Sequence, residues 1–303
     1  MRTSIDTEVL PKVAVLLATY NGSPYLREQL DSILAQQGVK VHIYVSDDQS
    51  RDATRRILEQ YRDETLCFTL FSPSQRLGSA GRNFYYLFEQ TRGALSNFDF
   101  VALADQDDIW LGDKLESAIK ELNDSQAAGL SSDVEAFWEH NNTRKVLRKS
   151  QPQKQYDYLF ESPGPGCSFV LRRELFQTFQ ERLVRAYPKL SAEVVYHDWL
   201  IYAFARSCGE KWLISNSPKM LYRQHGANEL GANSGWNALR HRLEFITSGL
   251  YRAQINAIAQ FCGCEEDSKL LNNYWRRFAF VPQSRRKLSG RFIIAAIFLL
   301  GLY

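Results

Sequence analysis

The stretch FDFVALADQDDIWLGDKL, residues 98–115, joins an apolar run to four aspartates, Asp105, Asp107, Asp108 and Asp113. The run FDFVALA has the length and the continuous apolar character of a buried strand. Like charges gathered after such a strand repel one another unless a positive partner offsets the repulsion. A hard divalent cation, Mg²⁺ or Mn²⁺, would do so, because it prefers oxygen ligands. The stretch therefore predicts a strand that ends in a metal site, although a solvated acidic turn without a metal fits the pattern too.

Strand-like and helix-like segments alternate up to this stretch. Four apolar runs predict buried strands: 13–18, 41–46, 66–71 and 98–104. Apolar residues at helical spacing predict three helices between them: 25–37, 53–61 and 83–91. This alternation predicts an α/β, Rossmann-like, mostly parallel sheet that is flanked by helices. In open sheets of this kind the ligand lies beyond the carboxyl ends of the strands, which is where this chain places its polar clusters.

The pattern is less regular in the second half of the chain. Residues 117–150 predict one helix followed by polar sequence, and residues 163–176 predict a Gly/Pro-rich loop, a strand and the start of a helix. Residues 195–209 predict a helix with Asp198 near its start, where a carboxylate favours the helix amides. Residues 219–233 predict a strand that runs into a glycine-rich loop.

At 303 residues the chain is long enough for one large domain with an appendage, which we place at residues 1–230 and 231–303. We expect the second part to be a helical C-terminal extension. It ends in a basic run, SRRKLSGR at 284–291, and an uncharged run, FIIAAIFLLGLY at 292–303. The uncharged run is too short to span a bilayer, which takes about 20 residues. The combination predicts either a helix at an anionic membrane surface or a final helix packed on the domain.

Composition and missing motifs argue against several classes of protein. A net charge of +3 is too small to indicate nucleic-acid binding by itself. Five widely spread cysteines and an N-terminus without an apolar signal segment predict no disulfide framework and a cytoplasmic location. The G-x-G-x-x-G turn of dinucleotide-binding proteins is missing after the first strand, and so is the phosphate-binding P-loop. The Q-x-x-R-W motif of processive polysaccharide synthases is also missing.

Six motifs occur in a characteristic order: VAVLLATYNGSPYL, VSDDQSRDATRRIL, ADQDDIWLGDKL, GPGCSFVL, HDWL and YRQHG. Over roughly residues 11–230 they resemble the inverting nucleotide-sugar glycosyltransferases of family two, which have the GT-A fold. More narrowly, they resemble the bacterial rhamnosyltransferases of that family. The resemblance implies transfer of a single sugar, rhamnose from dTDP-rhamnose, with Mg²⁺ or Mn²⁺ as cofactor. It also implies a glycan or lipid-linked acceptor in bacterial surface polysaccharide synthesis.

The resemblance implies a nucleotide-sugar pocket at the predicted strand ends: Thr19, Tyr20, Asn21, Asp48, Asn83, Asp105, Trp110 and Arg223. Tyr20 would lie near the base, and Asp48 would accept a hydrogen bond from a base N–H. Asn83 would approach the base or ribose, or would cap the following helix. Trp110 would form a wall of the pocket or lie in the core, and Arg223 would neutralise charge on the leaving diphosphate.

The resemblance also assigns the metal site. Asp107 is the first choice as direct ligand, and Asp105 would contact the ribose or the metal with its waters. His225 would be a metal ligand or proton donor, or would only order its own loop. We expect Asp108 and Asp113 to belong to the N-terminus of the next helix.

Asp198 matches the position of the family's general base. It would remove the proton of the acceptor hydroxyl while that oxygen attacks the anomeric carbon opposite the diphosphate. Its other possible role is that of a helix cap. Gly164 and Gly166 would let the backbone approach a substrate closely, or would serve the turn alone.

Two other functions stay open from the sequence alone. A related transferase that uses a UDP-hexose would keep the same metal and base, because thymine and uracil share the edge that Asp48 would read. A non-catalytic nucleotide-sugar-binding protein would keep the fold. Assays of donor hydrolysis distinguish these functions.

Overall fold

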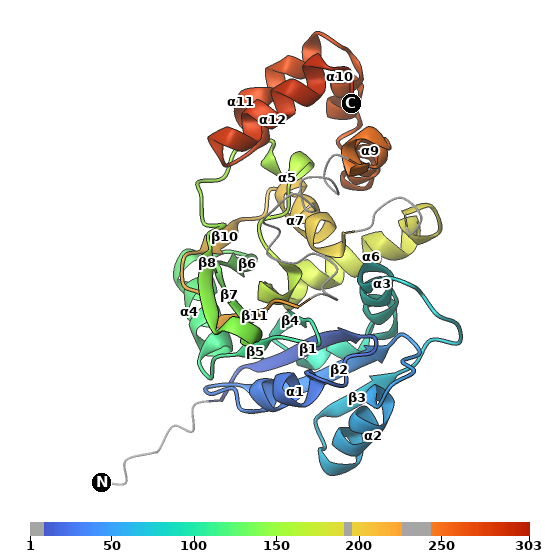
Figure 1. Ribbon diagram of the computed structural model, residues 1–303, viewed down its shortest axis with the longest axis vertical. Helices are drawn as coiled ribbons and strands as arrows, with labels where there is room; N and C mark the ends of the chain where they lie inside the picture. Colours follow the sequence, from blue (N-terminus) through green and yellow to red (C-terminus); the bar gives the residue numbers. More distant parts are fainter. Residues whose placement is uncertain (1–8, 191–195, 226–243) are drawn as a thin grey trace.

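The computed structural model describes residues 9–190, 196–225 and 244–303, and its centre is a seven-stranded sheet (Figure 1). The strands follow the order β10-β6-β9-β4-β1-β2-β3, and β9 runs antiparallel to both of its neighbours. The other neighbouring pairs are parallel. In chain order the strands are β1 (Lys12–Thr19), β2 (Lys40–Asp47), β3 (Phe68–Phe71), β4 (Phe100–Ala104), β6 (Gly129–Ser132), β9 (Val170–Arg172) and β10 (Trp212–Ser215). The mostly parallel α/β sheet predicted from the sequence is confirmed.

Helices cover both faces of this sheet. They are α1 (Leu26–Leu34), α2 (Thr54–Glu64), α3 (Ala80–Gln90), α4 (Lys114–Ser125), α6 (Arg173–Leu190) and α7 (His197–Ser207). Because successive side chains of a strand point to opposite faces of the sheet, β1 contributes side chains to two separate hydrophobic cores. Val13, Val15 and Leu17 pack in the core that includes α1, α2 and α4, whereas Ala14 and Leu16 pack in the core that includes α3, α6 and α7. In the view of Figure 1, α1 and α2 lie below β1, and α6 and α7 lie above it.

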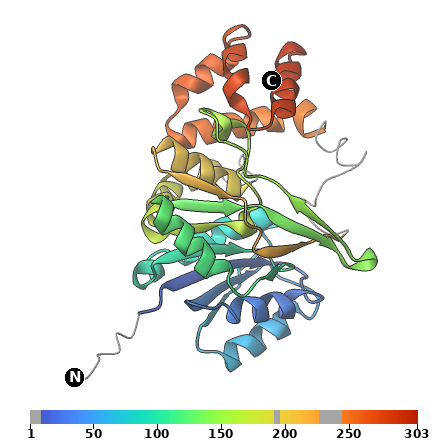
Figure 2. The ribbon, with the colours of Figure 1, turned by 90° about the vertical axis from the view of Figure 1, so that its left-hand side faces the viewer.

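A second, four-stranded sheet was not predicted. Its order is β5-β11-β7-β8, with β5 (Ile109–Trp110), β7 (Val134–Trp138), β8 (Thr143–Leu147) and β11 (Met220–Arg223). Only β11 was predicted as a strand. β5 has two residues, too few to give a pattern, and β7 and β8 lie in the region predicted to be polar sequence. The β7–β8 hairpin extends away from the domain in Figure 2.

The C-terminal extension is helical, as predicted, and packs on the domain. It contains α9 (Leu250–Cys262), α10 (Glu265–Asn272), η4 (Arg276–Phe280), α11 (Val281–Ser284) and α12 (Leu288–Leu299). The hydroxyl of Tyr251 donates to the carbonyl of Phe160 in α5 (Asp157–Phe160), at 3.0 Å. The predicted boundary at residue 230 lies outside the described residues. None of the helices in the described ranges combines the length and the hydropathy that a bilayer crossing requires.

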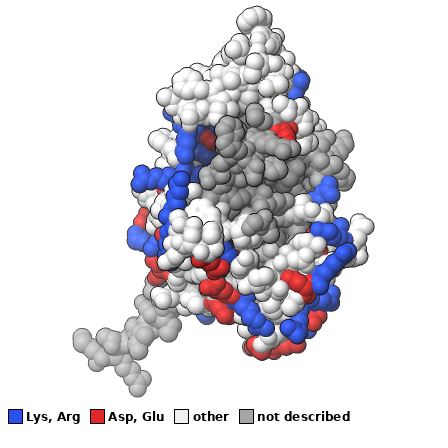
Figure 3. All heavy atoms as spheres, viewed as in Figure 1, with Lys and Arg blue, Asp and Glu red and all other residues white. Residues whose placement is uncertain are grey.

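The last helix, α12, has one buried face and one exposed face. Ile294, Ile297 and Phe298 lie in the core that the extension shares with the domain. On the other side Phe292 is 68% exposed and Leu300, just after the helix, is 69% exposed. Figure 3 shows that the C-terminal helices present a surface with few charged side chains in that view. The final helix is therefore packed on the domain and still leaves an apolar face uncovered.

Candidate active site

The register of the central sheet brings the ends of three strands together. Thr19 at the end of β1 lies opposite Asp47 at the end of β2, and Leu17 lies opposite Ala104 at the end of β4. The loops that follow these strands therefore meet at one edge of the sheet, as expected for a doubly wound fold. Most of the predicted site residues lie in these loops.

The structure brings Asp107 and His225 together although they are 118 residues apart. His225 Nε2 lies 2.8 Å from Asp107 Oδ2. The imidazole also stacks on the ring of Tyr25, with 4.7 Å between the ring centroids. An imidazole and a carboxylate at this separation are able to share one divalent cation, since both are metal-ligand types. The rest of the glycine-rich loop that follows His225 lies outside the described residues.

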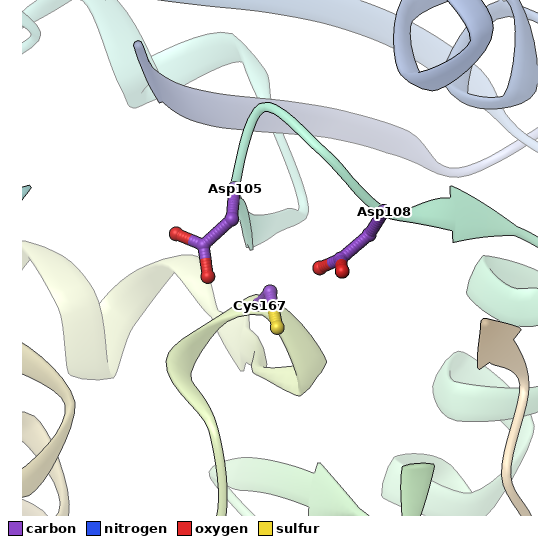
Figure 4. Close-up of side chains that lie close together, drawn as sticks. All are labelled: Asp105, Asp108 and Cys167. Carbon is purple, nitrogen blue, oxygen red and sulfur yellow. The ribbon is translucent and has the colours of Figure 1, made fainter. Parts of the chain in front are cut away.

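A second group of possible metal ligands lies next to this pair. Figure 4 shows Asp105 and Asp108 on either side of Cys167, and one ligand atom of each lies within 4.8 Å of the others. Burial, together with the charges of Asp107 and Asp105, raises the pKa of Asp108 well above its usual range. Burial and the nearby Asp108 raise the pKa of Cys167 as well. A protonated thiol is a poor ligand for Mg²⁺ or Mn²⁺, so the oxygen and nitrogen donors of Asp105, Asp107 and His225 fit such an ion better.

The prediction for Asp108 is wrong, whereas Asp113 lies where it was expected. Asp108 precedes β5 and is fully buried, and its Oδ1 accepts a hydrogen bond from the backbone N–H of Arg223 at 3.2 Å. Asp113 immediately precedes α4 and forms an ion pair with Lys219 at 2.5 Å, which lowers the pKa of Asp113. The short strand β5 separates the two residues, and a two-residue strand gives no signal in the sequence.

Gln106, the middle residue of the D-x-D sequence, holds the loop after β1. Its Oε1 accepts hydrogen bonds from the hydroxyl of Thr19 at 2.6 Å and from the backbone N–H of Tyr20 at 2.8 Å. Its Nε2 donates to the carbonyl of Tyr20 at 3.1 Å. Added bulk at Gly22 would collide with this amide, because a Cβ there would lie 2.4 Å from Gln106 Oε1. The loop after β4, which carries Asp105 and Asp107, is therefore joined by hydrogen bonds to the loop after β1.

The remaining loop residues form a polar surface beside these two loops. The guanidinium of Arg76 lies over the ring of Tyr20, 4.2 Å from its centroid. Asn21 has a left-handed backbone conformation, with φ of 49°, and its side chain accepts from the backbone N–H of Arg51 at 2.8 Å. Asp48 accepts from the backbone N–H groups of residues 77 and 78 at 2.5 and 2.9 Å. The contact between Asp48 and a base stays a prediction, and the structure shows that Asp48 orders the loop before α3.

Two predicted pocket residues are buried. Asn83 is 1% exposed, and its Nδ2 donates to the carbonyls of Thr19 and Ser46, both at 3.1 Å. It joins the ends of β1 and β2, and its approach to the base or ribose stays a prediction. Trp110 is 3% exposed and takes the second of its two predicted positions, in the core, with the ammonium of Lys114 3.6 Å from its ring centroid. Burial lowers the pKa of Lys114 to about 7.

Arg223 supports the D-x-D turn. Its side chain is 2% exposed and forms ion pairs with Glu28 and Glu139. Its Nε donates to the backbone carbonyl of Asp107 at 2.8 Å, and its guanidinium lies 4.7 Å from the ring centroids of Tyr25 and of Phe137. Its role in neutralising the leaving group stays a prediction.

Asp198 lies in the first turn of α7, in a partly buried position. Its Oδ2 accepts from the hydroxyl of Ser162 at 3.0 Å, and its Oδ1 accepts from the backbone N–H of Trp199 at 2.7 Å. Burial raises the pKa of Asp198 to about 6 even though both hydrogen bonds oppose the shift. A carboxylate with this pKa is ionised near neutral pH and binds a proton more readily than an ordinary aspartate, which suits a general base.

His197, the residue before Asp198, is packed against aromatic rings and is not suited to proton transfer. Its ring stacks on Phe84, with 3.9 Å between the centroids. Burial lowers the pKa of His197 to about 3, so the imidazole is neutral. Its Nε2 has no hydrogen-bond partner within residues 9–190, 196–225 and 244–303. His197 therefore packs beside Asp198.

One short segment, η3 (Gly166–Ser168), connects the two halves of the site. Cys167 lies beside Asp105 and Asp108, while a Cβ at Gly166 would lie 3.2 Å from the Cβ of Asp198. Consecutive residues of one loop thus contact the acidic strand end and the candidate base. The two predicted clusters therefore lie on either side of the same loop.

Comparison with known sequences agrees with this geometry. Residues 14–179 match the family model described as Glycosyl transferase family 2. The dTDP-rhamnosyl transferase RfbG of Shigella flexneri is 36% identical over 258 residues, which are 85% of this chain and 87% of that protein. The UDP-Glc:alpha-D-GlcNAc-diphosphoundecaprenol beta-1,3-glucosyltransferase WfgD of Escherichia coli is 29% identical over 170 residues, which are 55% of this chain and 62% of that protein.

Solved structures show the same fold. The mannosyltransferase PcManGT from Pyrobaculum calidifontis, in complex with GDP-Man and Mn²⁺, has a TM-score of 0.52 at 18% identity and covers 98% of this chain and 82% of its own. TarS 1–349 from S. aureus, in complex with UDP, has a TM-score of 0.52 at 20% identity. That match covers 70% of this chain, which spans 60% of the TarS chain. The chain belongs to glycosyl transferase family 2, and it is a glycosyltransferase with the GT-A fold.

Several residues of the site could not be assigned from the sequence. Four of them act through side-chain contacts over long separations: Ser162, Gln106, Glu28 and Glu139. Gln106 had a signal in the sequence, because it lies inside the D-x-D sequence, whereas the local sequence of the other three carries no distinguishing pattern.

We predict that Gly166→Ala impairs transfer while Gly164→Ala does not. A Cβ at Gly166 would lie 2.8 Å from His197 Nε2, so the His197–Asp198 pair has to move. A Cβ at Gly164 would meet its nearest atom at 3.5 Å, an ordinary contact. Because a displacement of about 1 Å can cost ~100-fold in rate, we expect a loss of that order for Gly166→Ala. Single-turnover transfer rates, with thermal unfolding of both variants, test this, and equal rates for the two would contradict it.

Proposed function

We propose that this glycosyltransferase is metal-dependent and inverting, and that it moves one rhamnose from dTDP-rhamnose onto a glycan or lipid-linked acceptor in bacterial surface polysaccharide synthesis. The observation that carries the proposal is the η3 loop, which has a carboxylate of raised pKa, Asp198, on one side and the carboxylates of Asp105 and Asp108, from the acidic turn after β4, on the other. The likeness to RfbG, whose name gives a dTDP-rhamnosyl transferase, supports the choice of donor.

The proposed mechanism is a single displacement. Asp198 accepts the proton of the acceptor hydroxyl as that oxygen forms a bond to the anomeric carbon, and the bond from this carbon to the diphosphate oxygen breaks. Mg²⁺ or Mn²⁺ held by Asp107, Asp105 and His225 would neutralise the charge that develops on the leaving diphosphate. Arg223 and Gln106 hold the D-x-D turn in place through its backbone and the neighbouring loop.

The proposed base contact does not separate thymine from uracil, because the two bases share the edge that Asp48 would read. The Tyr20 ring with Arg76 over it and the loop ordered by Asp48 form the edge that would receive the base. The likeness to WfgD, named for a UDP-Glc donor, favours a UDP-hexose as the second candidate. A non-catalytic binding protein would need neither the raised pKa of Asp198 nor its hydrogen bond from Ser162.

The donor is tested with a panel of dTDP-rhamnose, UDP-glucose and UDP-N-acetylglucosamine, each with and without Mn²⁺, by thermal shift and donor hydrolysis. A ligand that binds only the native state raises its stability, so we expect Mn²⁺-dependent stabilisation by dTDP-rhamnose. We predict that Asp107→Asn abolishes this metal dependence and that Asp113→Asn, in the same acidic stretch but paired with Lys219, keeps it. Stabilisation by UDP-sugars alone would replace the donor assignment, and no response to any donor would support the non-catalytic protein.

We predict that Asp198→Asn lowers the rate of transfer by about 10²- to 10⁴-fold, the usual contribution of a general base. Donor binding is expected to persist, because Asp198 lies on the acceptor side. In the unchanged protein the rate should fall as the pH drops through about 6, since protonation removes the base. Equal loss of donor binding and of transfer in Asp198→Asn would show that the side chain is structural.

We also propose that the protein is cytoplasmic and contacts the inner face of the membrane through the exposed side of α12, where a lipid-linked acceptor would lie. Five large apolar side chains form this side: Leu288, Phe292, Ile293, Leu299 and Leu300. The basic run that precedes it contributes less than its sequence predicts, because Arg286 is buried and Arg285 is paired with Glu161. Apolar insertion is therefore the main expected contribution to binding.

We predict that Phe292→Ser weakens sedimentation of the protein with vesicles of phosphatidylglycerol and phosphatidylethanolamine. Phe292 is 68% exposed, so the substitution leaves the fold intact. Leu66→Ser is the matched control, because Leu66 is fully exposed on the main domain in the turn between α2 and β3. Equal sedimentation of the two variants and of the unchanged protein would contradict a contact through α12.

A further inference from the structure

Arg286 belongs to the basic run of the tail, but its side chain is only 2% exposed. It lies against the segment that follows α5. Its backbone N–H donates to Glu161 Oε1 at 2.7 Å, and its Nη2 donates to the backbone carbonyl of Ser162 at 2.6 Å. Its Nη1 lies 3.4 Å from Asp157 Oδ2. A residue of the C-terminal extension therefore holds the residue whose hydroxyl contacts Asp198.

The acidic neighbours of Arg286 have other cationic partners. Asp157 also accepts from Arg206 at 3.1 Å and from the hydroxyl of Tyr202 at 2.9 Å. Glu161 lies 3.5 Å from Arg285. Within the described part of the chain, Arg286 is the one side chain that donates a hydrogen bond to the carbonyl of Ser162. The specific effect of Arg286 is thus on the position of Ser162.

The hydroxyl of Ser162 has two acceptors within reach. It lies 3.0 Å from Asp198 Oδ2 and 2.7 Å from the carbonyl of Gly164. A hydroxyl has one proton to donate and lone pairs with which to accept, so it donates to one of these oxygens at a time. The ionised carboxylate of Asp198 needs a donor, whereas a protonated carboxyl group offers one.

We propose that Arg286 is a positioning residue for transfer: it fixes Ser162 so that the serine hydroxyl remains hydrogen-bonded to Asp198 both before and after the carboxylate takes the acceptor's proton. Before transfer, Ser162 donates to Asp198 Oδ2. The acceptor hydroxyl then loses its proton to Asp198, its oxygen bonds to the anomeric carbon and the bond to the diphosphate breaks. With the proton on Oδ2, Asp198 donates to Ser162, and Ser162 turns its own proton to the carbonyl of Gly164. The inference rests on the proposed role of Asp198 as general base.

Lys149 is a charged side chain that acts electrostatically on Asp198. It lies in the segment after β8 and favours the ionised form of Asp198, while burial and the nearby Arg286 lower the pKa of Lys149 itself. His197 is neutral. Glu161 and Lys287 interact with Lys149. Of the interactions that favour the ionised form of Asp198, the hydrogen bond from Ser162 is the one whose donor residue Arg286 contacts directly.

The test compares the pH dependence of kcat/KM for Ser162→Ala, Arg286→Gln and the double variant. Loss of a hydrogen bond to the carboxylate removes an interaction that lowers the pKa of Asp198, so the acidic limb moves to higher pH. A hydrogen bond to a charged group corresponds to a shift of about one pH unit. Because both substitutions remove the same bond, the double variant should shift no further than Ser162→Ala. Mn²⁺-dependent donor binding, measured by thermal shift, should stay unchanged in all three.

Arg277 provides the matched control, because it is another buried arginine of the extension, and it donates to the carbonyls of Tyr303 and Phe298. Arg277→Lys and Arg286→Lys both disturb the extension, and only the second should move the acidic limb. Equal pH profiles for Arg286→Gln and the unchanged protein, or additive shifts in the double variant, would overturn the inference. Full activity of Asp198→Asn would instead overturn the proposed function, so the two failures are distinguishable.

Discussion

The crowding of carboxylates after β4 is the electrostatic constraint on which the rest of the site depends. The chain offsets the repulsion with partners from distant segments. Lys219 pairs with Asp113, and His225 lies against Asp107. Asp108 is buried, its pKa is raised, and its Oδ1 accepts a hydrogen bond from the backbone N–H of Arg223. The aspartates after β4 therefore have separate surroundings, and Asp105 and Asp107 are the ones proposed to hold the metal ion.

The positive partners come from β11 and its flanks, which explains why the second sheet lies beside the first. β11 pairs with β5, directly after the D-x-D turn, and its last residue is Arg223. The guanidinium lies between Tyr25 and Phe137 and is paired with Glu28 and Glu139. A buried cation is stable only with such partners, since desolvation is costly. The sheet that the sequence did not reveal therefore supports the acidic turn.

Continuous apolar runs made β1, β2 and β4 predictable, and the loop motifs placed Asp107 and His225 together. Patterns of this kind report the periodicity of a segment and the residue types in it. They do not report partners, which is why the burial of Asn83 and Arg223 was not foreseen and why Trp110 was left between a pocket wall and the core. Residue type does not show whether a polar side chain is buried or exposed, because this depends on contacts with residues that are distant in the sequence.

The partners of the C-terminal tail could not be predicted from its sequence either. Its basic and apolar runs predicted either a helix at a membrane surface or a final helix packed on the domain, and neither prediction included the hydrogen bond from Arg286 to the carbonyl of Ser162, 124 residues earlier. A composition rule cannot identify a partner at that separation. The extension is consequently attached to the catalytic half of the domain through a charged contact as well as through the shared apolar core.

Two carboxylates of the site, Asp198 and Asp108, lower the stability of the folded state when they are ionised. The folded-state pKa of Asp198 is raised from 3.8 to about 6, so the folded chain binds this proton more tightly than the unfolded chain does. Its contribution to stability therefore falls as the pH rises through that window and stays unfavourable at neutral pH. Asp108 acts in the same direction. A fold that tolerates these costs needs compensating packing, and Trp199, the residue after Asp198, lies in the core that α3, α6, α7 and the extension share. The extension thus contributes packing to α7, which carries Asp198, while Arg286 contacts the separate segment that carries Ser162.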